Sequence, residues 1–104
     1  MYVQTSSRGF PDGFPPPAVL GERPVDLAVV SMDVANREQR SGDSILHALQ
    51  APVVVFTHYE DFFSPRSRPP REIVKVDLDA TRAFFEARDD ARYIIPAWDA
   101  SFAL

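Results

Sequence analysis

Two apolar runs in the middle of the chain constrain its fold more than any other feature. Residues 25–32 (VDLAVVSM) and 53–57 (VVVFT) are rich in β-branched side chains, and turn-forming residues precede the first run. Near-continuous runs of this kind are typical of buried strands. Between them, Asp43 is a predicted N-cap for a helix over 43–50, which Pro52 prevents from continuing. The pattern predicts a βαβ unit.

This βαβ unit has a consequence for chemistry. Its two strands should be parallel and its crossover right-handed. Both strands then end at the same edge of the sheet, where open α/β sheets place their ligand sites. Asp33 follows the first run and His58 follows the second. We therefore expect these two polar residues to share one edge.

The flanking segments complete a single α/β domain over residues 1–104. Residues 2–5 form a possible short strand, and residues 6–24 form a Gly/Pro-rich loop. Residues 73–76 are a further short strand candidate. A helix is predicted over 78–88, capped by Asp77 or Asp79, and a last strand over 92–95 before Pro96.

Composition excludes several classes of function. The net charge of −4 opposes nucleic-acid binding through phosphate neutralisation. The chain has no cysteine, so disulfides and thiolate metal sites are excluded. No apolar stretch approaches the ~20 residues of a membrane helix, and the N-terminal residues lack a secretory pattern. We expect a cytoplasmic protein without nucleic-acid or membrane partners.

His58 is the residue that bears most directly on function. A strand end holds its imidazole rigidly, and imidazole is a common zinc ligand. Position alone favours the simpler interpretation, a histidine at the sheet edge that hydrogen-bonds a carbonyl group or Asp33. Asp33, Glu60 and Asp61 are candidates for contacts that orient the His58 imidazole, although adjacent acids after a strand, such as Glu60 and Asp61, are usually only solvated. His47 is interpreted as a surface or packing histidine.

Residues 53–63 (VVVFTHYEDFF) resemble a segment of the metallo-β-lactamase superfamily, in which an apolar strand leads into a metal-binding histidine. Residues 24–32 are similar to a family strand that begins Val-Asp-Leu-Ala, and the likeness extends over roughly residues 2–65. The resemblance implies a partial metallo-β-lactamase-like αβ layer, the C-terminal half of that fold. It also implies that His58 is the last histidine ligand of a metal-dependent hydrolase.

The main ligand motif of that family, His-x-His-x-Asp-His, is absent. The chain has only His47 and His58, and the stretch Gln4-Thr5-Ser6 offers no carboxylate for a bridging ligand. One His and one Asp would bind zinc only weakly, so zinc or another divalent metal is expected as a cofactor only if a partner supplies the remaining ligands, and the chain alone should be inactive. We expect self-association or a complementary chain, because an isolated layer exposes an apolar sheet face. The alternative is a small non-catalytic binding or interaction module. No catalytic or substrate-binding residue is assigned.

Overall fold

A parallel sheet of four strands forms the framework of this protein. In the computed structural model, residues 1–4, 14–58, 67, 77–96, 101 and 103 are described. The strands are β1 (Tyr2–Gln4), β2 (Leu27–Ser31), β3 (Val53–Thr57) and β4 (Arg92–Ile94), in the order β1-β2-β3-β4. All three strand pairs are parallel. The predicted α/β class and the parallel pairing of the two apolar runs are confirmed.

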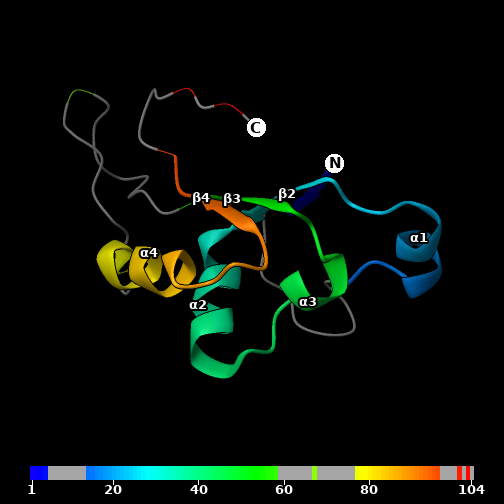
Figure 1. Ribbon diagram of the computed structural model, residues 1–104, viewed down its shortest axis with the longest axis horizontal. Helices are drawn as coiled ribbons and strands as arrows, with labels where there is room; N and C mark the ends of the chain where they lie inside the picture. Colours follow the sequence, from blue (N-terminus) through cyan, green and yellow to red (C-terminus); the bar gives the residue numbers. More distant parts are fainter. Residues whose placement is uncertain (5–13, 59–66, 68–76, 97–100, 102, 104) are drawn as a thin grey trace.

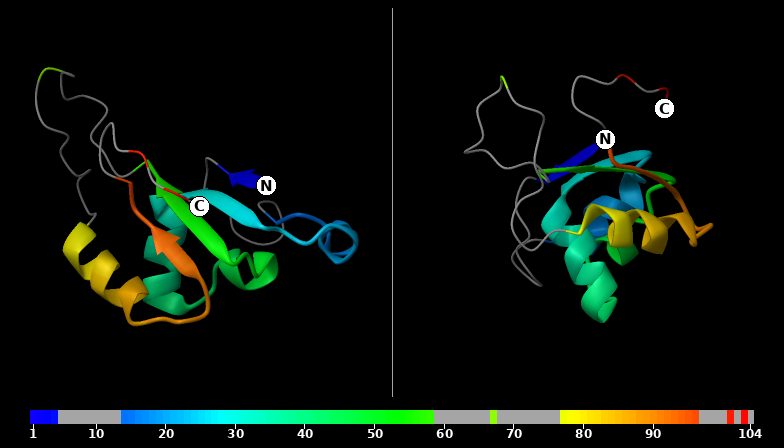
Figure 2. Two further views of the ribbon diagram at one scale, coloured as in Figure 1. Left: turned by 45° about the horizontal axis from the view of Figure 1, so that its top comes forward. Right: turned by 90° about the vertical axis from the view of Figure 1, so that its left-hand side faces the viewer.

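The helices α2, α3 and α4 all lie on one side of this sheet (Figures 1 and 2). The described helices are α1 (Pro17–Glu22), α2 (Met32–Ser41), α3 (Leu46–Leu49) and α4 (Leu78–Glu86). Consecutive strands that are neighbours place their connecting helices on a single face when every crossover has the same, right-handed sense. The sheet therefore has one helix-covered face and one face without a described helix.

The hydrophobic core fills the space between the sheet and these helices. Strand residues that face the helices are almost fully buried, among them Val30 and Phe56, both at 0% exposure. The ring of Phe85 from α4 lies 4.8 Å from that of Phe56 and 4.6 Å from that of Tyr93, measured between centroids. These aromatic contacts anchor α4 against β3 and β4.

The opposite face of the sheet carries a row of apolar side chains. Strand residues alternate between faces, and the pairing register aligns Val3, Val29, Val55 and Ile94 across all four strands. We call these residues the apolar row. Its members differ in exposure, from 55% at Val3 in the edge strand to 6% at Val55 in the interior.

The helix α2 is the main element that the sequence prediction missed. The predicted strand over 25–32 ends at Ser31, and Met32 already begins α2. Its buried side includes Met32, Ala35 and Glu38 at helical spacing, so a glutamate stands where an apolar residue would mark the periodicity. Gly42, with φ of 65°, ends the helix and donates its N–H to the Glu38 carbonyl, at 2.9 Å.

Other boundaries also differ from the prediction. The predicted helix over 43–50 is a single turn, α3. Asp43 does not cap it; instead, the Leu46 N–H donates a hydrogen bond to Ser44 Oγ, at 3.2 Å. The loop predicted over 6–24 contains α1, because Pro17 occupies a first-turn position where its missing N–H has no cost.

At the C-terminal side, α4 ends at Glu86 instead of Arg88, and β4 ends at Ile94 instead of Ile95. The predicted cap Asp77 is confirmed, since its Oδ1 accepts from the Ala80 N–H at 3.0 Å. The strand predicted over 73–76 lies outside the described residues.

Candidate functional site

The carboxyl ends of β2 and β3 meet at one edge of the sheet. Ser31 and Thr57, their last residues, are paired in register, and Thr57 Oγ1 donates to the Val30 carbonyl at 3.3 Å. Asp33 is in the first turn of α2, immediately beyond β2, and His58 immediately follows β3. Asp33 and His58 therefore lie at the same edge, which we call the carboxyl edge.

His58 is held in an unusual backbone conformation at this edge. Its φ is 60°, in the left-handed region, which costs an L-residue about 1–2 kcal/mol. The turn ends β3, and the side chain is half-buried, whereas Asp33 is exposed. Backbone strain of this kind often occurs at functional sites.

Ser31 adds a further polar atom at the carboxyl edge. The residue is 2% exposed, and its Oγ has no hydrogen-bond partner within the structure described for this chain. Although Ser31 precedes α2, it does not cap the helix with its side chain. Most buried hydroxyl groups are hydrogen-bonded, so this one departs from the rule.

The described residues do not complete a metal site. Within them, no three or more His, Cys, Asp or Glu side chains are grouped so that they could hold a metal ion. Zinc requires three or four protein ligands, and His58 with Asp33 offers at most two. Glu60 and Asp61, the other residues predicted to orient His58, lie outside the described residues.

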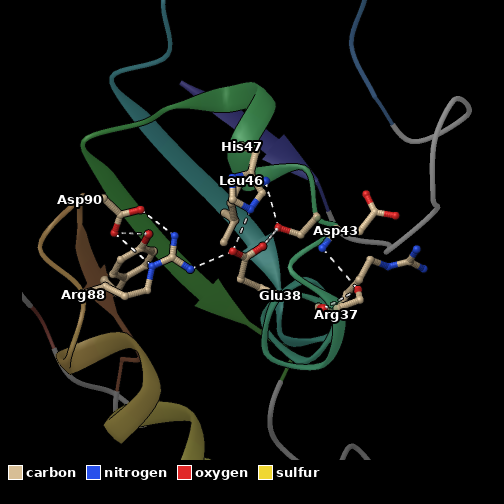
Figure 3. Close-up of polar contacts among 10 residues, drawn as sticks. Arg37, Glu38, Asp43, Leu46, His47, Arg88 and Asp90 are labelled. Atoms are coloured by element: carbon tan, nitrogen blue, oxygen red, sulfur yellow. Dashed lines mark hydrogen bonds and ion pairs between the residues drawn. The ribbon is translucent and has the colours of Figure 1, made fainter.

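A buried carboxylate, Glu38, is the centre of a second polar cluster that the sequence did not indicate (Figure 3). Glu38 is 4% exposed. Its Oε2 accepts from Ser44 Oγ at 2.6 Å, and its Oε1 lies 2.8 Å from Arg88 Nη1 and 2.9 Å from His47 Nε2. These partners come from the residues before α3, from α3 itself and from the residues after α4, so the cluster connects three helices.

Arg88 extends the cluster towards β4. Its guanidinium group also bonds Asp90 through two nitrogens, at 3.2 and 2.6 Å, and Asp90 accepts from the Tyr93 hydroxyl at 2.9 Å. The guanidinium carbon lies 5.5 Å from the centroid of the Tyr93 ring and 5.7 Å from that of Phe85, within the range of cation–π attraction. Charge and aromatic packing thus hold Arg88 in place together.

These contacts shift the protonation equilibria of the cluster. Burial raises the pKa of Glu38, but hydrogen bonds from Ser44 and Arg88 outweigh burial, so the pKa lies below its ordinary value. Burial and the hydrogen bond to Asp90 raise the pKa of Tyr93 to about 12. The hydrogen bond from Arg88 lowers the pKa of Asp90. Glu38 is therefore ionised at neutral pH.

The arrangement suits Glu38 for a structural role. Both carboxylate oxygens already accept hydrogen bonds from protein donors, and the ion is buried. A general base needs an oxygen that can reach a substrate proton. The sequence carries signals for the ends of α2: Asp33 in its first turn, Arg40 in its last turn and Gly42 as its terminator. Nothing in the sequence, however, pairs residue 38 with residue 88.

His47 is the other of the two histidines in the chain. His47, predicted to be a surface or packing residue, is mostly exposed and contacts Glu38, and Ser44 is a buried donor to the same carboxylate.

Comparison with models of known protein families, with curated proteins and with solved structures found no match to this chain. Among the described residues, no helix combines the length and apolar character needed to cross a membrane.

Proposed function

We propose that this chain is one αβ layer of a metal-dependent hydrolase of the metallo-β-lactamase type. In this proposal His58 contributes one metal ligand, and the layer has no hydrolytic activity until a partner supplies the others. The supporting observation is the alignment of Ser31 with Thr57, because it brings Asp33 and His58 to one edge of a parallel sheet.

The chemistry of the two residues fits this division of roles. A neutral imidazole at the end of a buried strand can be presented to a divalent metal with little loss of conformational entropy. The carboxylate of Asp33 would orient the imidazole from the neighbouring chain segment, in the way that outer-shell carboxylates fix histidine ligands. Glu60 and Asp61 are proposed for the same role.

The apolar row supports the need for a partner. The exposed Val3 and the half-buried Val29 and Ile94 give the helix-free face apolar surface that a second layer can cover, whereas Val55 is already buried. We propose that this face associates with a complementary chain or with a second copy.

Light scattering on the purified chain should report a dimer or larger species. Val3→Lys should weaken association, whereas Val19→Lys should not, although Val19 on α1 is 49% exposed and Val3 is 55% exposed. Two variants that behave alike, or a strictly monomeric chain, would count against this part of the proposal.

Zinc binding by the isolated chain tests the ligand assignment. Calorimetric titration should give weak zinc binding that His58→Ala abolishes and Asp33→Asn reduces, because a single imidazole holds the ion poorly without further ligands. His47→Ala is the matched control, since His47 is the only other histidine and belongs to the Glu38 cluster. Zinc binding that depends on His47 and not on His58 would overturn the assignment.

A non-catalytic binding module is the second candidate function. The lack of a three-ligand group among the described residues favours it. It predicts no zinc binding, and no effect of His58→Ala other than a small change in stability. The zinc titration therefore separates the two candidates.

A further inference from the structure

A large apolar cavity lies between α1 and α3. Its volume is about 710 Å³, within the range of small-molecule sites. Pro15, Pro16 and Pro17 line one side, with Leu20 and Gly21 of α1, and Ala48, Leu49 and Gln50 line another. The remaining described lining residues are Phe14, Pro24 and Val25.

The helix α1 is only lightly packed against the other described residues. It has six residues, none of them buried, and no side chain caps its N-terminus with a hydrogen bond. Isolated helices shorter than ~12–15 residues are marginal in water, so a helix of this length depends on packing for its stability. Its apolar residue Leu20 is half-buried against the hydrophobic core and also lines the cavity. Material that filled the cavity would supply the missing contacts.

The lining defines the chemistry of the occupant. None of the described lining residues carries a charge, and Gln50 is the polar side chain among them. An ion transferred into such surroundings would lose hydration without gaining a counter-charge. Several proline rings and the Leu49 side chain, 4% exposed, form a wall with few rotatable bonds. A wall of this kind loses little entropy when a ligand binds.

We infer that this cavity binds an uncharged, largely apolar small molecule, with Gln50 as its hydrogen-bonding partner. The site is separate from the carboxyl edge. Pro24 and Val25 precede β2, and Gln50 precedes β3, so the cavity adjoins the opposite ends of the same strands. The length of β2 separates the two places by roughly 13 Å, at about 3.3 Å per residue.

The neutral fluorophore N-phenyl-1-naphthylamine is a suitable probe. Its fluorescence should rise on binding to the metal-free chain, and Gly21→Phe should weaken binding about tenfold by filling the cavity. A side chain at Gly21 is sterically tolerated, because a Cβ there meets no atom within 4 Å. Val19→Phe is the matched control on the same helix, since Val19 is 49% exposed and does not line the cavity. It should leave binding unchanged.

Two further measurements distinguish the cavity from other apolar surfaces. Bound dye should slow hydrogen exchange of the amides of α1, and Val3→Lys on the apolar row should not alter affinity. The anionic dye 1-anilinonaphthalene-8-sulfonate should bind more weakly than the neutral one. The inference is overturned if the neutral dye does not bind, if Gly21→Phe and Val19→Phe bind it alike, if Val3→Lys abolishes binding, or if the anionic dye binds more tightly. Because no metal is added, these outcomes do not depend on the hydrolase proposal.

Discussion

Replacement of Glu38 by alanine tests whether the buried cluster holds the helices together. The substitution removes an acceptor for Ser44, Arg88 and His47 from a residue that is 4% exposed. The affected groups differ in their access to water: the side chain of Arg88 is 23% exposed and that of His47 is 59% exposed, whereas Ser44 is 3% exposed. Arg88 also keeps its bonds to Asp90.

The expected loss of stability follows from these differences. A hydrogen bond to a charged group contributes about 1.5–3 kcal/mol, and a buried donor left without an acceptor, here the Ser44 hydroxyl, costs about 1–3 kcal/mol. His47 and Arg88 can be rehydrated in part, so the lower end of the ~3–5 kcal/mol range for breaking a buried ion pair applies. We expect Glu38→Ala to lower the free energy of unfolding by about 3 kcal/mol, a large part of the ~5–15 kcal/mol typical of a domain.

Urea unfolding followed by circular dichroism measures this change. With an m-value near ~1.5 kcal/mol/M, the midpoint should fall by about 2 M while the m-value stays constant. Glu86→Ala is the control, because Glu86 is an exposed glutamate on α4, and it should change stability by no more than about 0.5 kcal/mol. A loss below about 1 kcal/mol for Glu38→Ala, or equal losses for the two variants, would refute the reasoning.

Three further predictions concern stability. The folded-state pKa of Glu38 lies below its ordinary value of 4.5. Its carboxylate therefore stabilises the fold above pH 4.5, and this contribution is lost as the pH falls through the folded-state pKa. The urea midpoints of the wild type and Glu38→Gln should converge on acidification, and curves that stay parallel would contradict this. Gln50→Gly should stabilise the chain by about 1 kcal/mol, because Gln50 has a φ of 46° at the end of α3; thermal unfolding should give a higher midpoint, and an unchanged or lower one would show that the left-handed turn is not a cost. Asp77→Ala should cost about 1 kcal/mol by removing the cap of α4, whereas Asp77→Asn should restore most of it in the same assay; equal losses would argue against a capping role.

The sheet could be predicted from the sequence because its signals are local. The runs VDLAVVSM and VVVFT are apolar and β-branched, and a helix between them makes parallel pairing the natural arrangement. The same topological rule led from residue order to a shared edge for Asp33 and His58. Asp77 was predictable as a cap for the same reason, since its partner Ala80 is three residues away.

The Glu38 cluster could not be predicted because its signals are not local. The buried side of α2 includes a glutamate, and the periodicity of apolar residues gives no sign that residue 38 is buried. The charge on Glu38 is compensated by Arg88, 50 residues away, through contacts that exist only when α2 and α4 pack side by side. The cavity beside α1 is likewise a property of packing between distant segments.

Paramagnetic relaxation by Mn²⁺ tests the metal-ligand role of the carboxyl edge most directly. Amide resonances of the isolated, isotope-labelled chain should broaden first in the segments around Asp33 and His58, and His58→Ala should remove that effect while His47→Ala should not. Broadening centred on His47 and the Glu38 cluster, or an unchanged pattern in His58→Ala, would contradict the proposal that His58 binds a metal ion.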